Sequence, residues 1–391
     1  MPIQRIHCAL AILILFCAIF RTTSAEDTAP LPGPVRLMLP PVLYAVAGHE
    51  TNVYFDNVTL TLNPANYAFD VHCPKGQHQA ERWTFTPKEE DVGKHTFAID
   101  VRNEQNEIIA RDDCELVVVS AKANAQAELT LLLIGDSLTH ASIYPQHLLD
   151  LSQAPDQPKI KLIGSHNPQG DAAKDNRHEG YGGWTALRFA TFFSETARTG
   201  EYAKRGSPFL YLDDKGEKRL DFKRYCQDVN DGKYPDVATI FLGPNDLFSF
   251  TDEDIDDGIN VMLTHFDLLV DMLRANDSKT KVAVMLPVPP TASQDAFGNN
   301  YGTSQTRWQY KRNIHLVVER MLDSYAGKEE QGIFIIPTNV NLDCEHNYPT
   351  AEGKWNSQAD SAGIRQSNSV HPAASGYRQI GDSLYAWLLS Q

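Results

Sequence analysis

The segment LTLLLIGDSL, residues 129–138, joins a short apolar run to a Gly-Asp-Ser triplet, and it decides the fold. A run without polar alternation is typical of a strand buried on both faces of a parallel sheet. Four later runs have the same character, at residues 159–163, 237–242, 281–286 and 332–336. The stretches between them place apolar residues at three- and four-residue spacing, which predicts helices. Five strands with crossover helices predict a three-layer, doubly wound parallel sheet.

The chain before this segment follows a different pattern. Residues from about 35 to 120 contain short runs rich in Val, Tyr, Phe, Thr and Ile, separated by turn residues, which predicts strands. Their number and spacing favour an all-β, immunoglobulin-like sandwich over residues 30–120. Residues 121–126 are small and polar and predict a linker. The α/β domain is therefore expected over residues 127–391.

The first 25 residues are typical of a cleaved secretory signal peptide. Arg5 supplies a positive start, residues 9–20 form a short apolar run, and residues 23–25 are small. An uncleaved anchor is the alternative, although the run is short for a bilayer span. We therefore expect a secreted or periplasmic protein without stable membrane insertion after cleavage.

Charge and cysteine content narrow the function classes. The formal net charge is −15, and such a surface repels phosphate backbones, so we expect no nucleic-acid partner. Cleavage leaves four cysteines, Cys73, Cys114, Cys226 and Cys344, and no C-x-x-C pair, so we expect neither a zinc site nor a cofactor. An even number in an exported chain favours disulfides. Pairing within each region predicts Cys73–Cys114 and Cys226–Cys344, and buried free thiols are the alternative.

Three motifs follow apolar runs or are rich in glycine. Ser137 comes at the predicted junction of the first strand with a helix, where a serine is exposed at the sheet edge near backbone amides. Residues 178–185, HEGYGGWT, contain glycines that allow the backbone to approach a ligand closely. In residues 243–246, GPND, the side-chain amide of Asn245 can donate to an oxyanion. Each motif alone also fits an ordinary turn.

A fourth motif lies near the end of the chain, at residues 368–372, NSVHP. Pro372 disfavours a helical conformation at His371, so we expect this histidine on a loop, where a base can reach a serine.

Together and in this order, the four motifs resemble the four blocks of the SGNH, or GDSL, hydrolase family. The resemblance covers residues 129–391 and implies a flavodoxin-like fold and a carboxylic ester hydrolase. It implies that Ser137 is the nucleophile and His371 its base. It also implies an oxyanion hole formed by the Ser137 amide, by Gly183 and by Asn245, with Gly182 as the alternative to Gly183.

The flanking acids of two motifs, Asp136 and Asp246, are expected to support these residues. One departure from the family concerns the position three residues before the histidine, where the family has an aspartate and this chain has Asn368. An asparagine carbonyl can accept from an imidazole N–H, but it carries no charge. We predict that Asn368 is a neutral orienter of His371. Asp360 or a backbone carbonyl is the alternative acceptor.

The sequence of the second motif resembles that of the exported carbohydrate esterases. This resemblance implies small acyl esters of carbohydrates, above all acetyl esters, as substrates. Tyr181, Trp184, Trp308 and the aromatics of residues 200–225 are candidates for a sugar-binding cleft. The alternative is that they belong to the core. Two other functions stay open: a lipid or thioester hydrolase of the lysophospholipase or arylesterase type, and a weakly active or non-catalytic glycan-binding derivative.

Overall fold

The computed structural model describes residues 35–391 except 198–203, 276 and 278. Its central sheet contains five parallel strands in the order β11 (Lys159–Ile163), β10 (Glu128–Gly135), β15 (Val237–Phe241), β16 (Lys281–Met285) and β17 (Ile333–Ile336). A short strand, β12 (Glu179–Gly180), also pairs with β10. The predicted α/β fold with a parallel sheet is confirmed. The sheet has six strands rather than five, because the second motif adds β12, which is too short to form an apolar run.

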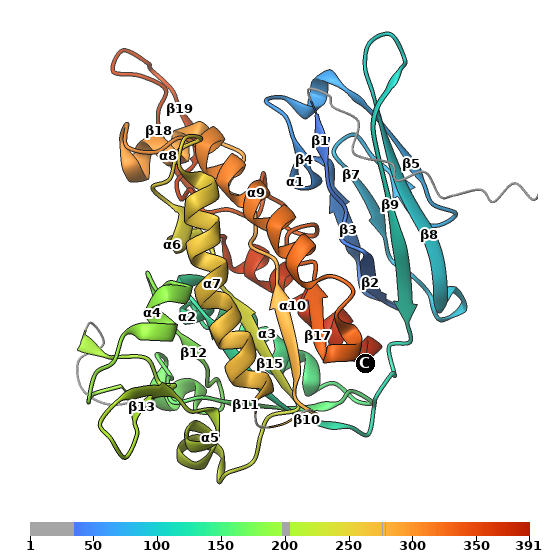
Figure 1. Cartoon of the computed structure of the whole chain (residues 1–391). Helices are drawn as coiled ribbons and strands as arrows, with labels where there is room; N and C mark the ends of the chain where they lie inside the picture. The colour runs from blue at the N-terminus through green and yellow to red at the C-terminus, as the bar shows by residue number, and fades with distance from the viewer. Residues whose placement is uncertain (1–34, 198–203, 276, 278) are drawn as a thin grey trace, which may run out of the picture. The chain divides into compact units, whose positions relative to one another are not determined.

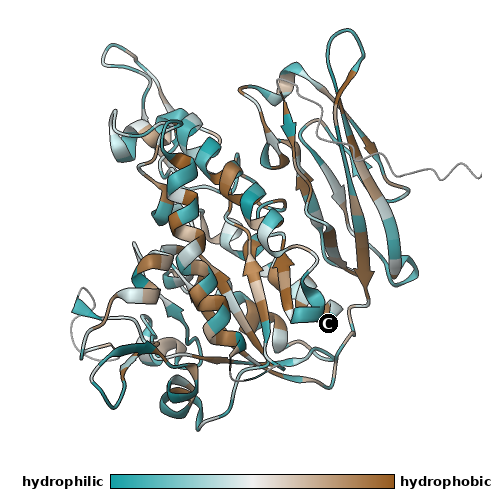
Figure 2. Cartoon of the chain, viewed as in Figure 1, coloured by the Kyte–Doolittle hydropathy of each residue, from teal (hydrophilic) through white to brown (hydrophobic). Residues whose placement is uncertain are grey.

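Helices cover both faces of this sheet (Figure 1): α7 (Ile255–Arg274) and α9 (Arg307–Tyr325) on one face, α3 (Ile143–Ser152) and α10 (Ala374–Ser390) on the other. Alternate residues of β10 enter the two cores. Leu132 and Ile134 pack with the first pair of helices, and Leu131 and Leu133 with the second. All four side chains are fully buried, and each stabilises the fold by about 1.5–3 kcal/mol. Figure 2 shows the apolar strands between helices whose outer faces are polar.

The strand order places a binding edge at the end of β10. The chain winds from β10 outward to β11 and then back across β10 to β15, so the connections diverge between β10 and β15. Sheets of this type bind ligands at that point, outside the carboxyl ends of the strands. Gly135 ends β10, and a Cβ there would lie 2.0 Å from Thr139 Oγ1. Only glycine therefore lets the short helix α2 (Ser137–His140) turn back so closely.

Residues 35–120 form β structure around a core of their own. A four-stranded sheet has the order β2 (Val42–Val46), β9 (Ile108–Val119), β8 (Gly93–Arg102), β5 (Ala68–His72), and a three-stranded sheet has the order β3 (Thr51–Tyr54), β7 (Arg82–Phe85), β6 (Gln77–His78). Trp83 of the smaller sheet packs edge-on against Phe97 of the larger, at 5.0 Å between ring centroids. The region also contains a helical turn, α1 (Phe55–Val58). The immunoglobulin-like assignment stays a prediction.

The remaining elements are β1 (Arg36–Leu37), β4 (Thr59–Leu60), α4 (Ala186–Thr191), β13 (Leu210–Leu212), β14 (Lys218–Leu220), α5 (Phe222–Asn230), α6 (Pro244–Leu247), α8 (Gln294–Tyr301), β18 (Thr350–Lys354), β19 (Ala362–Gln366) and four short 3₁₀ turns: Pro64–Asn66, Glu89–Asp91, Gly170–Ala173 and Glu329–Gln331. None of the helices within the described ranges is both long and apolar enough to cross a membrane. The predicted signal peptide, residues 1–25, lies outside the described residues.

The predicted disulfides are not formed, because all four of these cysteines are free thiols. Cys73 directly follows β5 and Cys114 lies in β9, and strand β8 separates these two strands. Two strand spacings are about 9.6 Å, which exceeds the Cα separation that a disulfide spans. Cys226 and Cys344 belong to the cores on opposite faces of the central sheet. The alternative, buried free thiols, fits three of the four, since Cys73 is partly exposed.

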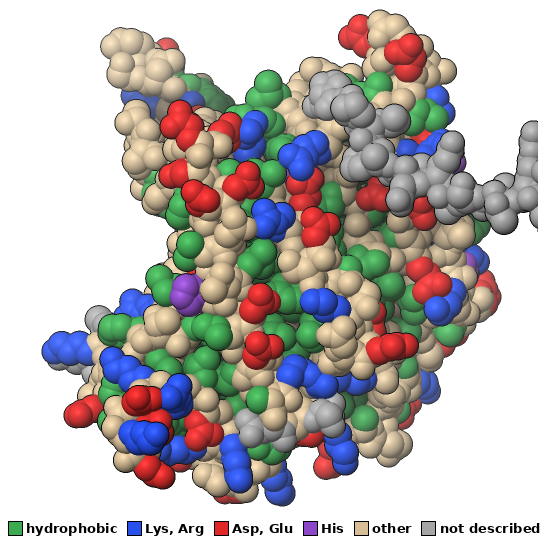
Figure 3. Space-filling model, in the orientation of Figure 1, with side chains coloured by type: hydrophobic (Ala, Val, Ile, Leu, Met, Phe, Trp, Pro, Cys, Tyr) green, Lys and Arg blue, Asp and Glu red, His purple; other side chains and the backbone are tan. Residues whose placement is uncertain are grey.

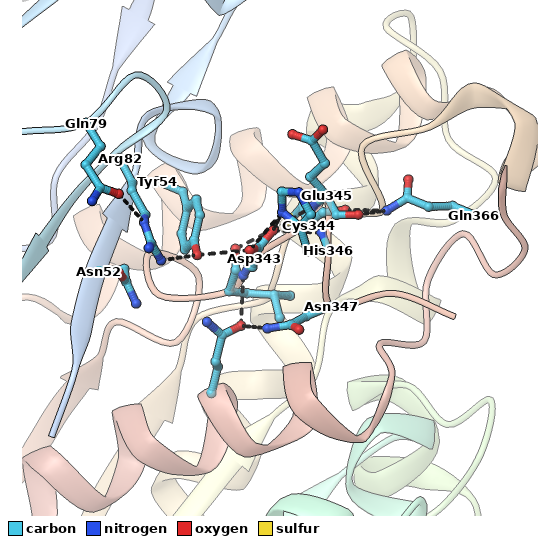
Figure 4. Close-up of polar contacts among 12 residues, drawn as sticks. Asn52, Tyr54, Gln79, Arg82, Asp343, Cys344, Glu345, His346, Asn347 and Gln366 are labelled. Carbon is cyan, nitrogen blue, oxygen red and sulfur yellow. Dashed lines mark hydrogen bonds and ion pairs between the residues drawn. The ribbon is translucent and has the colours of Figure 1, made fainter. Parts of the chain in front are cut away.

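Polar contacts join the β structure to the loop that follows β17. Asn57 Nδ2 donates to the carbonyl of Leu342 at 2.7 Å, and the Tyr54 hydroxyl donates to Asp343 Oδ2 at 3.2 Å. Arg82 in turn donates to the Tyr54 hydroxyl at 2.9 Å (Figure 4). These bonds connect β3, α1 and β7 with the segment that leads toward the fourth motif.

Candidate functional site

Ser137 and His371 are in direct contact although 234 positions separate them in the sequence. The distance between Ser137 Oγ and His371 Nε2 is 2.8 Å. Ser137 is the first residue of α2, just beyond the carboxyl end of β10. His371 lies on the loop between β19 and α10, as the following proline predicted. A hydroxyl and an imidazole at this distance can exchange a proton, which is the first requirement of a serine nucleophile.

The imidazole of His371 has no charged partner among the described residues. Among the residues described, no carboxylate forms a hydrogen bond or ion pair with it. Burial lowers the pKa of His371, because a partly buried imidazolium loses hydration and no anion compensates the loss. The ring is therefore neutral, and able to accept a proton, down to a lower pH than an exposed histidine.

Asn368 contacts the backbone of the loop that carries His371. Its Oδ1 accepts hydrogen bonds from the backbone amides of Val370, at 3.1 Å, and His371, at 2.9 Å. These bonds close a local turn, which is the ordinary preference of an asparagine side chain. Through these bonds Asn368 orients the backbone of His371, and its role as a neutral orienter of the imidazole stays a prediction. Asp360 is exposed in the connection between β18 and β19, and no hydrogen bond joins it to His371 in the described part of the chain.

Neutral amide side chains hold the loop that carries His371. Asn300, in α8, accepts at Oδ1 from both the amide and the hydroxyl of Ser369, each at 2.8 Å, and donates to the carbonyl of Ser367 at 3.1 Å. Thr291 donates its backbone amide to the carbonyl of Ser369 at 3.1 Å. Gln366, at the start of the loop, donates to the carbonyl of Cys344 at 2.8 Å (Figure 4). These contacts could not be predicted from the sequence, because Asn300 and Gln366 lie outside the motifs.

The second motif forms a tight turn beside the serine. The Tyr181 amide donates to the carbonyl of Gly135, and the Trp184 amide donates to the carbonyl of Tyr181 at 3.1 Å. Gly183, third in this turn, has φ of +75°, which strains any residue with a side chain. Gly182 has no positive φ. Gly183 is also exposed, whereas Gly182 is partly buried, so Gly183 is the more accessible of the two to a ligand.

Asn245 connects three of the motifs. It lies in α6, after β15, and its Nδ2 donates to Asp136 Oδ2 and to the carbonyl of Trp184, both at 3.2 Å. These two acceptors fix the side-chain amide with its nitrogen toward the serine and glycine motifs. A fixed amide donor at the edge of the sheet suits the stabilisation of a developing oxyanion.

Asp136 and Asp246 are buried carboxyl groups that hold backbone amides. Asp136 Oδ1 accepts from the Leu138 amide at 2.9 Å, and Asp246 Oδ1 accepts from the Ala186 amide at 2.9 Å. Burial raises the pKa of Asp136, and that of Asp246, to about 7 in each case, chiefly because the charged form loses hydration. Asp136 thus fixes the turn after Ser137, and Asp246 fixes the start of α4 against α6.

Glu179 is a third acid at the site, and its sequence context predicted no role for it. It is fully buried, and its oxygens accept from the Ser165 amide and hydroxyl and from the hydroxyls of Tyr181 and Tyr225, at 2.6–3.0 Å. Burial raises the pKa of Glu179. Its place inside the second motif was the available signal, but sequence alone does not distinguish a buried acid from an exposed one.

Two of the aromatics expected in a sugar-binding cleft belong to the core. Tyr181 is 0% exposed and Trp184 is 1% exposed, and their rings stack on each other at 4.5 Å. Trp308, on α9, is partly exposed. Tyr181 and Trp184 therefore pack in the core beside the glycine turn. No group of three or more metal-ligating side chains occurs within the described ranges.

The fold and this edge of the sheet define a doubly wound α/β hydrolase. In it, a serine and a histidine from distant motifs form a hydrogen bond. A comparison with family models matches residues 131–384 to the GDSL-like lipase/acylhydrolase family. The chain belongs to this family and is a carboxylic ester hydrolase.

Solved structures with a similar fold include several carbohydrate esterases. A carbohydrate esterase of family 3 from Talaromyces cellulolyticus is 15% identical, with a TM-score of 0.36, and the match covers 67% of this chain and 97% of that one. A family 3 carbohydrate esterase from Clostridium thermocellum is 16% identical, with a TM-score of 0.37 and coverages of 66% and 94%. An acetyl xylan esterase is 14% identical, with a TM-score of 0.34 and coverages of 66% and 100%. A comparison with curated proteins found no match.

Proposed function

We propose that this protein is an exported esterase that removes small acyl groups, above all acetyl groups, from carbohydrates. The observation that carries the proposal is the 2.8 Å contact between Ser137 Oγ and His371 Nε2 at the carboxyl edge of the sheet. Ser137 Oγ attacks the ester carbonyl while its proton passes to His371 Nε2. The alcohol then leaves with that proton, and a water molecule activated by the same histidine hydrolyses the acyl-serine.

The proposed oxyanion hole uses three donors from three motifs. They are the amide of Ser137, the amide of Gly183 in its exposed turn, and Asn245 Nδ2, which Asp136 and the Trp184 carbonyl hold in place. The backbone amides need little reorganisation as negative charge develops on the carbonyl oxygen. Both N–H groups of Asn245 Nδ2 already have acceptors, so one of them passes from Asp136 or the Trp184 carbonyl to the oxyanion when the ester binds.

The substrate class rests on the second motif and on the expected signal peptide. The HEGYGGWT segment resembles the exported carbohydrate esterases, and an exported enzyme meets extracellular polysaccharides. Release of acetate from an acetylated polysaccharide, together with hydrolysis of nitrophenyl esters of increasing acyl length, tests this proposal. We expect acetate release and a preference for the acetyl ester. Faster hydrolysis of long acyl chains would instead identify the lipid or thioester hydrolase.

A second candidate is a weakly active or non-catalytic glycan-binding derivative. One observation favours it: His371 has no carboxylate partner in the described residues, so its imidazolium is less stabilised during attack. The same assay separates the two candidates. A protein that binds the polysaccharide but releases no acetate from it, and hydrolyses no nitrophenyl ester, is the derivative and not the enzyme.

A further inference from the structure

The hairpin of β18 and β19 comes directly before the loop that carries His371. The two strands pair antiparallel, with Gly353 opposite Gly363 and Glu352 opposite Ile364. The hairpin projects beyond α8 (Figure 1), and the space-filling view shows it as a free-standing arm at the upper left (Figure 3). The residues of both strands are mostly exposed, so the hairpin contributes little to either core.

Trp355 lies at the end of β18 and is 50% exposed. A Cβ on Gly363 would lie 1.9 Å from Cζ2 of the indole, so the ring rests directly on the backbone of β19. The guanidinium of Arg365 lies 4.7 Å from the ring centroid. Gly363 and Arg365 are two residues apart and share one face of the strand. The indole therefore lies against β19 and Arg365, and half of the Trp355 surface remains open to solvent.

Other contacts fix the orientation of this ring. Arg365 donates to the carbonyl of Trp355 at 3.1 Å and forms an ion pair with Asp295 of α8 at 3.3 Å. The guanidinium is thus held from both sides, and cation–π attraction holds the indole against it. A rigid, half-exposed indole loses little conformational freedom when a ligand packs on it. The same side chain adds little to stability, because half of its surface remains in water.

We propose that Trp355 is a stacking platform for a sugar ring of a polymeric substrate whose acyl group lies at Ser137. The inference rests on the proposed function and names its substrate as a polysaccharide rather than a small sugar ester. The apolar C–H face of a pyranose ring packs on an exposed aromatic ring of this kind. Six peptide units separate Arg365 from His371, which limits the distance between their Cα atoms to about 21 Å. A chain of a few sugar units spans that distance.

The hairpin does not present the single apolar surface that a lipid bilayer or acyl chain requires. Ile364, 71% exposed, points to the face opposite Trp355, because successive residues of a strand alternate. Glu352 stands directly across from Ile364 on that face. The apolar side chains are therefore divided between two faces, and one of these carries a carboxylate. A single sugar ring on a single indole fits this arrangement better.

The test compares polymeric and small substrates in three variants. Trp355→Ala removes the platform, and Gly363→Ala places a methyl group beneath the indole and tilts it. Ile364→Ala is the matched control, since it truncates an exposed apolar residue on the other face of the same hairpin. For Trp355→Ala and Gly363→Ala, we expect the ratio of kcat/KM on acetylated polysaccharide to kcat/KM on nitrophenyl acetate to fall about three- to tenfold. Ile364→Ala should leave this ratio unchanged.

Two other outcomes would refute the proposal that Trp355 is a stacking platform. An unchanged ratio in Trp355→Ala, with the wild-type enzyme active on both substrates, shows that the indole contacts no sugar. Equal losses on both substrates show that the hairpin acts by positioning His371 instead. A wild-type protein that hydrolyses neither substrate refutes the proposed function itself. Affinity electrophoresis of the Ser137→Ala protein in acetylated polysaccharide then tests the platform alone, because Trp355→Ala in that background should reduce the retardation.

Discussion

Ser137 and His371 approach each other from two regions of the molecule that are built differently. Ser137 lies at the end of a central strand, and buried carboxyl groups hold the turns around it, among them Asp136 and Asp246. His371 lies on a loop that leads from an exposed hairpin, and the side chains that hold this loop are neutral amides, Asn300 and Asn368. The serine region has strong, desolvated hydrogen bonds, whereas the histidine region has several weaker ones near the surface.

This difference between the two regions predicts that substitutions in them lower activity to different extents. A buried carboxyl that loses its partner leaves an unsatisfied polar group in the core, so changes in the serine region should be severe. In the histidine region, each hydrogen bond is partly exposed and several act together, so changes there should be graded. The following experiments test the comparison, starting with the largest expected effect.

Ser137→Ala should reduce turnover by at least about a thousandfold, because the members of a nucleophile–base pair act as a unit. The variant should fold normally, since among the residues described the Ser137 hydroxyl forms a hydrogen bond only with His371. Initial rates on nitrophenyl acetate and circular dichroism measure both properties. Ser152→Ala, a change at the last residue of α3, serves as the control. Retention of wild-type turnover by Ser137→Ala would refute the nucleophile assignment.

Asn245→Ala should lower kcat by about 10²–10³ with little change in KM, because the lost donor acts mainly in the transition state. Asp136→Asn provides a sharper version of the same test. An amide nitrogen at the position of Asp136 Oδ2 would face Asn245 Nδ2, and two donors cannot pair. Asn245 should therefore turn away, and kcat should fall in this variant as well. A defect confined to KM in both variants would contradict an oxyanion role.

Asn300→Ala should lower kcat about tenfold, since it removes three partly exposed hydrogen bonds from the loop that carries His371. Asn299→Ala is the matched control, because Asn299 is its neighbour in α8 and donates a single bond, at 3.1 Å, to the same Ser367 carbonyl. We expect a smaller loss for this control. KM should stay constant in both, as neither asparagine is placed against the ester. Equal effects of the two variants would show that Ser369 does not need its contact with Asn300.

The same comparison explains how far the sequence could predict the site. The parallel strands were evident because most of them are apolar runs, although β11 contains Lys159 and Lys161, and the serine and Asn245 motifs follow such runs directly. The contacts of the histidine region were not evident. Asn300 and Gln366 are ordinary polar residues in the sequence, and only the fold brings α8 beside the loop. The backbone contacts of Asn368 were not evident either, because an asparagine side chain can accept from an imidazole or from nearby backbone amides, and sequence alone does not decide between them.

The β structure also reaches the histidine region. Arg307, in α9, donates to Asp56 Oδ2 at 2.8 Å and to the carbonyl of Thr291 at 3.0 Å. The amide of Thr291 in turn donates to the Ser369 carbonyl, two residues before His371. A continuous path of hydrogen bonds thus connects α1 with the loop of the base. The serine region has no comparable path to residues 35–120 in the contacts described, so the β structure is expected to support the base and not the nucleophile.

Asn368→Asp should have the smallest effect on rate and the clearest effect on pH dependence. His371 must be neutral to act as a base, so activity falls as pH drops through its pKa, which burial holds below the usual 6.5. An aspartate at position 368 can still accept from the amides of Val370 and His371, so the turn should be retained. Its negative charge near the ring favours imidazolium and raises the pKa, by up to about one unit. The acidic limb of the kcat/KM profile should therefore move to higher pH, with kcat at pH 8 changed little.

Asn368→Ala separates the effect of charge from the effect of turn formation. It should lower kcat by loosening the turn, without moving the acidic limb to higher pH. If Asn368→Asp leaves the acidic limb in place, the carboxylate does not sense the imidazole, and the limb reports another group, such as Asp136, whose pKa burial raises to about 7.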